Sequence, residues 1–314
     1  MSDSKITTEV LVEYLRCKYK AYLILTGIVP EPSPYEQWEH RNEQCYAVAA
    51  RSVLVRENSC LDTVQSLTHE HLKQGSAFVV NSHIQQEHFA FSFDALQRVP
   101  GASRLGLFHY VPVLFSNRSS NESEKLRLSC EGLVLEQLQL VYPRTGILVS
   151  GSAHRLQTFD LAARRYKAQK VLDDLTAYLR GETKPRMVLN DHCRVCRYQQ
   201  RCRVEAQQLD DLSLLNKMSE REIQLYHRKG IFTVNQLSYT FRIKKRGRRV
   251  KARGRPHSFP LQALAIREQS VFVVSRPKIA ETLTQVYVDM EGSPSGRFVY
   301  LIGLIIVENN ITQE

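Results

Sequence analysis

Apolar residues recur along the first two thirds of the chain with two different periods. Spacings of three and four residues predict helices over 7–25, 35–57, 61–73, 124–140 and 161–180. The first of these helices ends before a run of three prolines, and the last ends at a glycine. The first helix also carries a cysteine, Cys17.

Strands are predicted where apolar and polar residues alternate. Three phenylalanines at every second position from residue 88 onward predict a half-buried strand, and Pro100-Gly101 predicts a turn into the next one. The predicted strands are 77–82, 88 to the turn, 105–116 and 146–150. Because these strands alternate with helices, the sequence predicts an α/β fold for this part of the chain.

The sequence after residue 208 is organised differently. Two short helical stretches flank Lys229-Gly230-Ile231, and Thr233 is placed to cap the second stretch. This pattern predicts a helix-hairpin-helix-like segment with a basic loop over 209–262, whose backbone N–H groups would face a phosphate backbone. A plain helical linker is the alternative. The last region, 280–314, predicts two strands around a Gly/Pro turn.

Composition predicts a cytoplasmic protein. The chain has 314 residues, 43% of them hydrophobic, which is enough for a sizeable core. It has no apolar run of the ~18 residues that span a bilayer, and the first ten residues are polar rather than signal-like, so no membrane partner is predicted. The seven cysteines are an odd number without a secretion signal. A reducing compartment is therefore expected.

The positive charge is concentrated in one segment. The net charge is +11, and nine Lys/Arg and no acid lie within 241–256. A basic segment of this kind is either a solvated loop or a surface that binds phosphates, and the neighbouring hairpin favours the second interpretation. The residues predicted to contact DNA or RNA are Lys229, Lys244, Lys245, Arg246, Arg248, Arg249, Lys251 and Arg253.

Four cysteines have the spacing of a metal site. Cys193, Cys196 and Cys202 form a C-x2-C-x5-C array, and Cys17 could supply the fourth thiolate from the other end of a domain. Arginines between the late cysteines would stabilise thiolates. The alternative is a chance or redox C-x2-C pair with Cys17 as an ordinary buried residue. Zinc and a 4Fe-4S cluster both accept four cysteines, and spacing does not separate them.

This cysteine array, around a mixed α/β core, resembles the iron-sulfur-stapled branch of the RecB-family PD-(D/E)xK nucleases, which includes the CRISPR-associated exonucleases. The resemblance covers roughly residues 1–205. It implies a restriction-endonuclease-like core over 1–208, closed by a helical staple in which the four cysteines hold a 4Fe-4S cluster. It also implies a nuclease site that binds Mg²⁺ or Mn²⁺.

The nuclease motif is only partly present. The resemblance places Asp94 at the first carboxylate of the motif and His40 at a histidine found on an early helix of these nucleases. The family has Glu-x-Lys on the next strand, where this sequence has Pro112-Val113-Leu114. One carboxylate holds a catalytic divalent ion poorly. The centre is therefore expected to be degenerate.

The C-terminal region resembles the first strands of a YprB-type ribonuclease H-like domain, which some RecB-like proteins carry after a helix-hairpin-helix segment. The resemblance makes Asp289 and Glu291 the first two acids of a second metal site, and residues i and i+2 of a strand point to the same side. The remaining acids of such a site would come later than Glu314. A downstream polypeptide is therefore an expected partner.

Three functional hypotheses follow. The leading one is a RecB-like protein that binds nucleic acid through an iron-sulfur-stapled fold with a degenerate centre. The second is an active Mg²⁺- or Mn²⁺-dependent nuclease whose ligands are displaced or are completed by a downstream chain. The third is a zinc-stapled adaptor that binds nucleic acid.

Overall fold

The computed structural model describes residues 5–57, 61–63, 66–117, 121–242, 258–273, 282, 284–292, 299–308 and 311–313. The chain divides into two compact units, Met1–Gln208 and Leu209–Glu314. The first unit has the bounds of the first predicted domain. No helix among the described residues is both long and apolar enough to cross a membrane.

A mixed sheet forms the centre of the first unit. Its strands are β1 (Ile6–Thr7), β2 (Leu61–Thr63), β3 (Phe78–Gln85), β4 (Phe89–Ser103), β5 (Gly106–Ser116), β6 (Thr145–Ser150) and β7 (Arg155–Asp160). The order is β2-β3-β4-β5-β6-β7, with β1 paired to β4. β3, β4 and β5 are antiparallel, whereas β5 and β6 are parallel because α5 (Glu122–Gln139) crosses between them. The predicted α/β class is confirmed.

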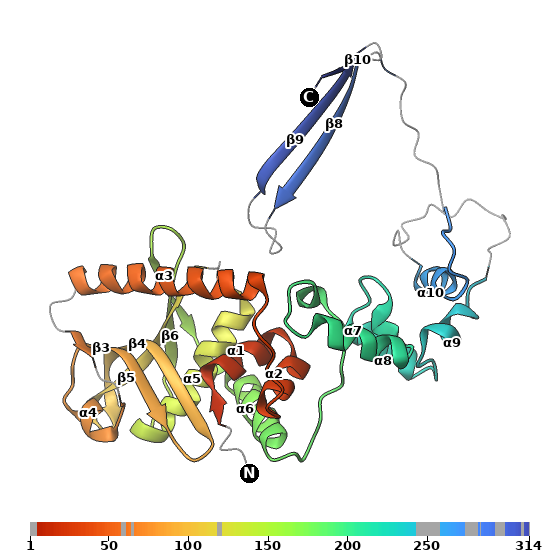
Figure 1. Ribbon diagram of the computed structural model, residues 1–314. Helices are drawn as coiled ribbons and strands as arrows, with labels where there is room; N and C mark the ends of the chain where they lie inside the picture. Colours follow the sequence, from red (N-terminus) through yellow and green to blue (C-terminus); the bar gives the residue numbers. More distant parts are fainter. Residues whose placement is uncertain are drawn as a thin grey trace. The chain divides into compact units, whose positions relative to one another are not determined.

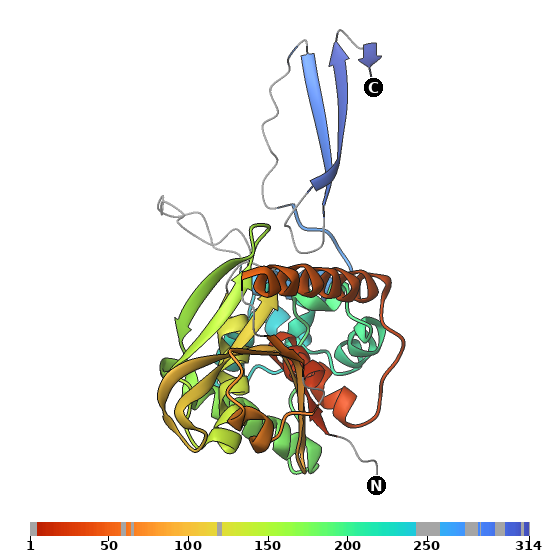
Figure 2. The same ribbon diagram turned by 90° about the vertical axis from the view of Figure 1, so that its left-hand side faces the viewer.

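Helices cover both faces of this sheet (Figure 1). The long helix α3 (Pro34–Glu57) lies over one face, where Leu54 packs with Val111 and Val113 of β5. Figure 2 shows α3 above the curved strands, seen from the side. The other face is covered by α1 (Thr8–Arg16), α5 and α6 (Arg165–Leu179). Residues 110–115 of β5 are buried on both faces, which explains the apolar run there.

The first predicted helix is in fact two helices. α1 ends at Arg16, α2 (Lys18–Leu25) starts at Lys18, and Cys17 between them is extended, with φ −159° and ψ 112°. The prediction of one continuous helix was wrong, because the apolar spacing continues across the break. The break matters for function, since it gives the Cys17 side chain a direction that a helical residue there would not have.

Other boundaries also differ from the predictions. The predicted helix over 61–73 is wrong: that segment holds strand β2 and the short α4 (His69–Lys73), which is capped by Thr68. β4 continues through Pro100-Gly101 to Ser103, with an irregular register there, so the reversal comes later than predicted. β7 was not predicted at all, because its side chains are mostly exposed and it lacks an apolar face.

The second unit contains the predicted helical pair and strand pair. α8 (Glu220–His227) and α9 (Val234–Ser238) flank the turn at Lys229-Gly230, and Thr233 Oγ1 accepts the N–H of Gln236 as a helix cap. α10 (Phe259–Arg267) packs against α9. β8 (Thr284–Gly292) and β9 (Val299–Glu308) form an antiparallel pair, extended by β10 (Ile311–Gln313).

Candidate metal centre and adjoining cavity

The four predicted cysteine ligands meet at one small cavity of the first unit. Cys17 lies between α1 and α2, and Cys193 lies within a 3₁₀ helix (Asp191–Arg194). Cys196 follows that helix, and Cys202 lies on α7 (Gln199–Gln208). All four line a cavity of about 10 Å³. The structure thus brings together thiols from the two ends of the unit. We call Cys17, Cys193, Cys196 and Cys202 the cysteine site.

Backbone amides point at the sulfurs of the cysteine site. The Asn190 N–H donates to Cys193 Sγ at 3.3 Å, and the Tyr198 N–H donates to Cys196 Sγ at 3.4 Å. The first amides of α2 act on the Cys17 thiol in the same way and oppose the effect of burial on its pKa. Amide donors of this kind stabilise thiolates and tune the potential of iron-sulfur clusters.

Burial raises the pKa of every thiol in this site, to about 11 for Cys196 and about 12 for Cys202. Without a bound cation, the four groups therefore remain thiols at neutral pH. A metal or cluster binds thiolates, so its binding would release protons and weaken in acid.

The spacing of the sulfurs matches neither a closed zinc site nor a filled cluster. A tetrahedral zinc site with Zn–S bonds of about 2.3 Å holds its sulfurs about 3.8 Å apart. Within the described part of the chain, no three of these thiols have their sulfurs within 4.8 Å of one another. The sulfurs also leave a space of about 10 Å³, close to one water-sized sphere. A zinc ion would therefore need the sulfurs to move together, whereas a 4Fe-4S cluster, with its eight core atoms, would need the space between them to widen.

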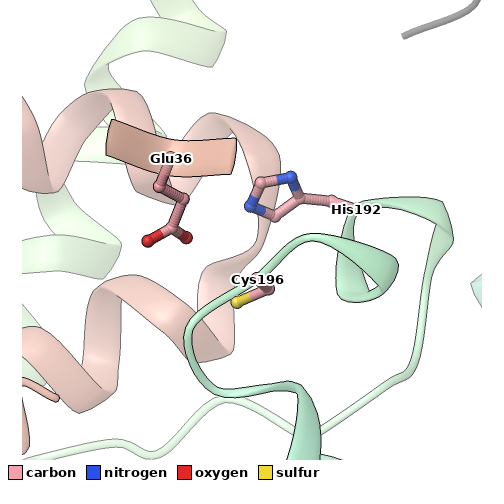
Figure 3. A group of neighbouring side chains, drawn as sticks. All are labelled: Glu36, His192 and Cys196. Carbon is pink, nitrogen blue, oxygen red and sulfur yellow. The ribbon is translucent and has the colours of Figure 1, made fainter. Parts of the chain in front are cut away.

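A buried lysine, Lys20, lines the same cavity as the cysteine site. Lys20 Nζ is 2.6 Å from Glu36 Oε1, 2.8 Å from Glu13 Oε2 and 3.4 Å from His192 Nε2. Figure 3 shows that the side chains of Glu36, His192 and Cys196 point toward one another, and their ligand atoms lie within 4.8 Å of one another. Because the Lys20 ammonium already contacts Glu36 and His192, this group is an ion network rather than a second metal site.

The same network attaches the segment with Cys193, Cys196 and Arg197, which we call the cysteine loop, to α3. Glu36 accepts from Arg197 Nε at 2.7 Å and from the Arg197 N–H at 3.2 Å. These contacts with Lys20 and Arg197 lower the pKa of Glu36 to about 2 despite its burial. Sequence reasoning missed Lys20 and Glu36, since no spacing rule connects them.

A second, larger cavity of about 250 Å³ contains the predicted nuclease residues. Asp94 and His40 both line it, from β4 and α3, together with residues of α1 and α5. Asp94 Oδ2 accepts the N–H of Phe115 at 2.9 Å. His40 is exposed, and Gln44 Nε2 lies 2.8 Å from its Nε2. We call this the acidic cavity, because Glu43 and Glu124 line it as well.

The second strand of the predicted motif gives the acidic cavity neither an acid nor a lysine. Leu114 and Phe115 of β5 line it, and Pro112 pairs with Leu96 of β4. Of the described residues, no lysine lines the cavity, and its bases are Arg16 and Arg127. The structure therefore has apolar residues at Pro112, Val113 and Leu114, the positions that the resemblance aligns with Glu-x-Lys.

A buried ion pair lies beside Asp94. Arg127 Nε is 2.9 Å from Glu131 Oε1, and its Nη2 is 4.0 Å from Asp94 Oδ2. Only 1% of the Glu131 side chain is exposed. Burial raises the pKa of Glu131 to about 7; Arg127 opposes this shift, and the charge of Asp94 adds to it.

We predict that Glu131 makes the first unit less stable as the pH rises from about 5 to 8. Folding raises its pKa from 4.5 to about 7. The protonated Glu131 therefore makes its full contribution to the free energy of unfolding below pH 4.5, and this contribution is lost as the pH rises through about 7. This pKa shift lowers the free energy of unfolding by roughly 2–3 kcal/mol between pH 5 and 8. Urea unfolding across this range measures it. Glu131→Gln should remove this component, and identical pH profiles for both proteins would contradict the prediction.

The hairpin between α8 and α9 uses its backbone amides internally. The N–H groups of Lys229, Gly230 and Ile231 donate to carbonyls of α8, and those of Phe232 and Thr233 donate to Gln236 Oε1. The expectation that these amides face a phosphate backbone is therefore wrong for this turn. Any contact of the hairpin with a phosphate would use a side chain such as that of Lys229.

The other predicted site residues belong to the second unit. Asp289 and Glu291 lie on β8, opposite Gly303 and Leu301 of β9, and Tyr300 donates to Glu291 at 3.3 Å. The seven predicted nucleic-acid residues from 244 to 253 lie outside the described residues.

Comparison with known proteins gives no matching family model, and no curated protein matches the chain. The relation to the RecB-like nucleases is therefore a proposal that depends on the cysteine site and on the sheet.

Proposed function

We propose that the chain is a RecB-like protein that binds nucleic acid, with a 4Fe-4S cluster as a structural staple and a degenerate PD-(D/E)xK centre. The observation that carries the proposal is the meeting of Cys17 with Cys193, Cys196 and Cys202 at one cavity. Thiols that fold from both ends of an α/β unit to one point, with amides directed at two of their sulfurs, are the chemistry that an iron-sulfur staple needs.

The residues that line the acidic cavity support the proposal that the nuclease centre is degenerate. In the proposed alignment, Asp94 of β4 is the first carboxylate of the motif, and Leu114, which also lines the cavity, takes the position of its lysine. Lysine helps to orient the attacking water in this chemistry, so its replacement by leucine removes a component that a divalent ion alone does not supply. We therefore expect binding of DNA or RNA with little or no cleavage.

The second unit is proposed to strengthen binding to nucleic acid. The basic segment 241–256 and Lys229 supply positive charge that would neutralise phosphates and release counterions. The pair β8 and β9 is proposed to be the start of a ribonuclease H-like domain, with Asp289 and Glu291 as its first acids and a downstream polypeptide as its complement. The open edges of such a strand pair favour the addition of further strands.

The proposal predicts brown protein that binds nucleic acid without cutting it. Protein purified without oxygen should absorb broadly near ~400 nm and contain about four irons per chain, whereas a colourless, zinc-loaded protein would support the adaptor alternative. Binding should weaken steeply between about 50 and 200 mM salt. Incubation with single- and double-stranded DNA and RNA in Mg²⁺ or Mn²⁺ tests cleavage. Robust cutting that Asp94→Ala abolishes would support the active nuclease instead.

A further inference from the structure

The turn between α8 and α9 presents aromatic rings beside a positive charge. Phe232 is 51% exposed, and its ring centroid lies 5.0 Å from that of His227. The Lys229 ammonium lies 5.8 Å from the centroid of the Tyr226 ring, and Lys229 itself is exposed. We call Tyr226, His227, Lys229 and Phe232 the hairpin patch.

The packing of the hairpin does not account for Phe232. Ile223 of α8 and Val234 and Leu237 of α9 are the buried apolar residues here, each at most 1% exposed. An apolar residue just before a helix cap often packs on the fourth helical residue, which is Leu237 for the cap Thr233. Leu237 is fully buried whereas half of Phe232 is exposed, so this packing leaves much of the phenylalanine side chain in solvent.

Side chains, and not amides, are what this turn offers to a ligand. The N–H groups from Lys229 to Thr233 that would face a phosphate backbone donate within the hairpin instead. Proteins that bind single-stranded nucleic acid combine aromatic side chains, which stack on bases, with cations that follow the phosphates. The hairpin patch has both components. The basic segment 241–256, which begins shortly after α9 in the sequence, adds nine positive charges and no acid.

We propose that the hairpin patch binds single-stranded nucleic acid, with an unpaired base stacked on Phe232 and a neighbouring phosphate at Lys229. Bases in a duplex are already paired and stacked, and a base must leave the duplex before it can stack on a protein ring, which costs free energy. The patch therefore selects single strands over duplexes. This inference rests on the proposed binding of nucleic acid and names the form that is bound.

The experiment measures the affinity of the full, cluster-loaded chain for a fluorescently labelled single strand and for its duplex by anisotropy, with DNA and RNA in separate series. Phe232→Ala should weaken single-strand binding by at least about fivefold, the loss typical of one stacked base. Its duplex binding should equal that of the wild type. Phe232→Trp should bind single strands as the wild type does, because a larger ring also offers a face to any base.

Leu225→Ala is the matched control. Leu225 lies on α8 and is 46% exposed, so the substitution removes a similar amount of exposed apolar surface without removing a ring. The control should bind both forms of nucleic acid like the wild type. Thermal unfolding checks that each variant is folded.

The salt dependence separates the stacked base from the phosphate contact. Lys229→Gln should make the slope of log affinity against log salt shallower by about 0.7 on single strands, the contribution of one phosphate contact. Phe232→Ala should lower the affinity at every salt concentration and leave this slope unchanged, because stacking releases no counterion.

The outcomes separate this inference from the proposed function. If the wild type binds nucleic acid and Phe232→Ala binds single strands equally well, the stacking site is overturned and the proposed function stands. Equal losses on single strands and duplexes, or an equal loss in Leu225→Ala, would also overturn it. A wild type that binds neither form overturns the proposed function and this inference together.

Discussion

Cys17→Ser is expected to abolish binding of the proposed 4Fe-4S cluster and to lower the melting temperature of the first unit by roughly 10–20 °C. A structural metal site can contribute about 10 kcal/mol of binding free energy that is available only to the folded chain. The sheet and its two apolar faces remain in the variant, so we expect a loss on the order of 5 kcal/mol, and a unit of this size changes its melting temperature by about 2–4 °C per kcal/mol. Iron analysis and calorimetry, both without oxygen, measure the two effects.

Cys45→Ser is the matched control for this prediction. Cys45 is an exposed thiol on α3 and does not line the cysteine cavity. The control should keep about four irons per chain and the wild-type melting temperature. A Cys17→Ser protein with unchanged iron and stability would show that Cys17 is an ordinary partly buried residue, which is the alternative that its sequence context left open.

The break at Cys17 shows what the sequence could and could not predict about the cysteine site. The convergence of the four cysteines was predicted from the C-x2-C-x5-C spacing and from the four thiolates that a tetrahedral metal site takes. The extended conformation of Cys17 did not follow, since the apolar residues before and after it fit a single helix. Tertiary contacts decide this break, and periodicity reports only which face is buried.

The strands illustrate the same limit. β4 and β5 were predictable because their side chains alternate or are buried on both faces. β7 has exposed side chains along nearly its whole length, and its main contacts are the backbone hydrogen bonds to β6. Hydrophobic pattern contains no signal for such an edge strand. The helix wrongly predicted over 61–73 has the opposite cause, since its apolar spacing fits a helix although part of it pairs with β3.

The charged residues of the site were the least predictable. Lys20 and Glu124 are residue types that usually face solvent, yet 1% of Lys20 and 8% of Glu124 are exposed. Their partners and neighbours lie on other elements, so no local rule identifies them. Arg127 is similar, because only the fold places it beside Asp94. The sequence located the cysteine site and one acid of the cavity, and the structure added the ions that surround both.

Lys20→Met is expected to destabilise the first unit by about 3–5 kcal/mol, because it leaves Glu13 and Glu36 buried near one another without their shared cation. The control is Lys18→Met, two residues earlier: its side chain is 50% exposed and its pair with Asp174 is 3.4 Å long. That exposed pair should contribute less than about 1 kcal/mol. Urea unfolding of both variants gives the comparison.

A second substitution separates buried charge from lost packing. Without Lys20, Glu13 keeps only the longer pair with Arg16 at 3.6 Å. Glu13→Gln in the Lys20→Met background removes this weakly compensated carboxylate, so it should restore part of the lost stability, whereas Glu13→Gln alone should not stabilise the wild type. Glu36 retains Arg197 in every variant, and the cysteine loop should therefore stay attached to α3 and keep its iron. Equal effects of Lys20→Met and Lys18→Met would mean that water screens the charges of Lys20, Glu13 and Glu36, and that this ion network does not stabilise the first unit.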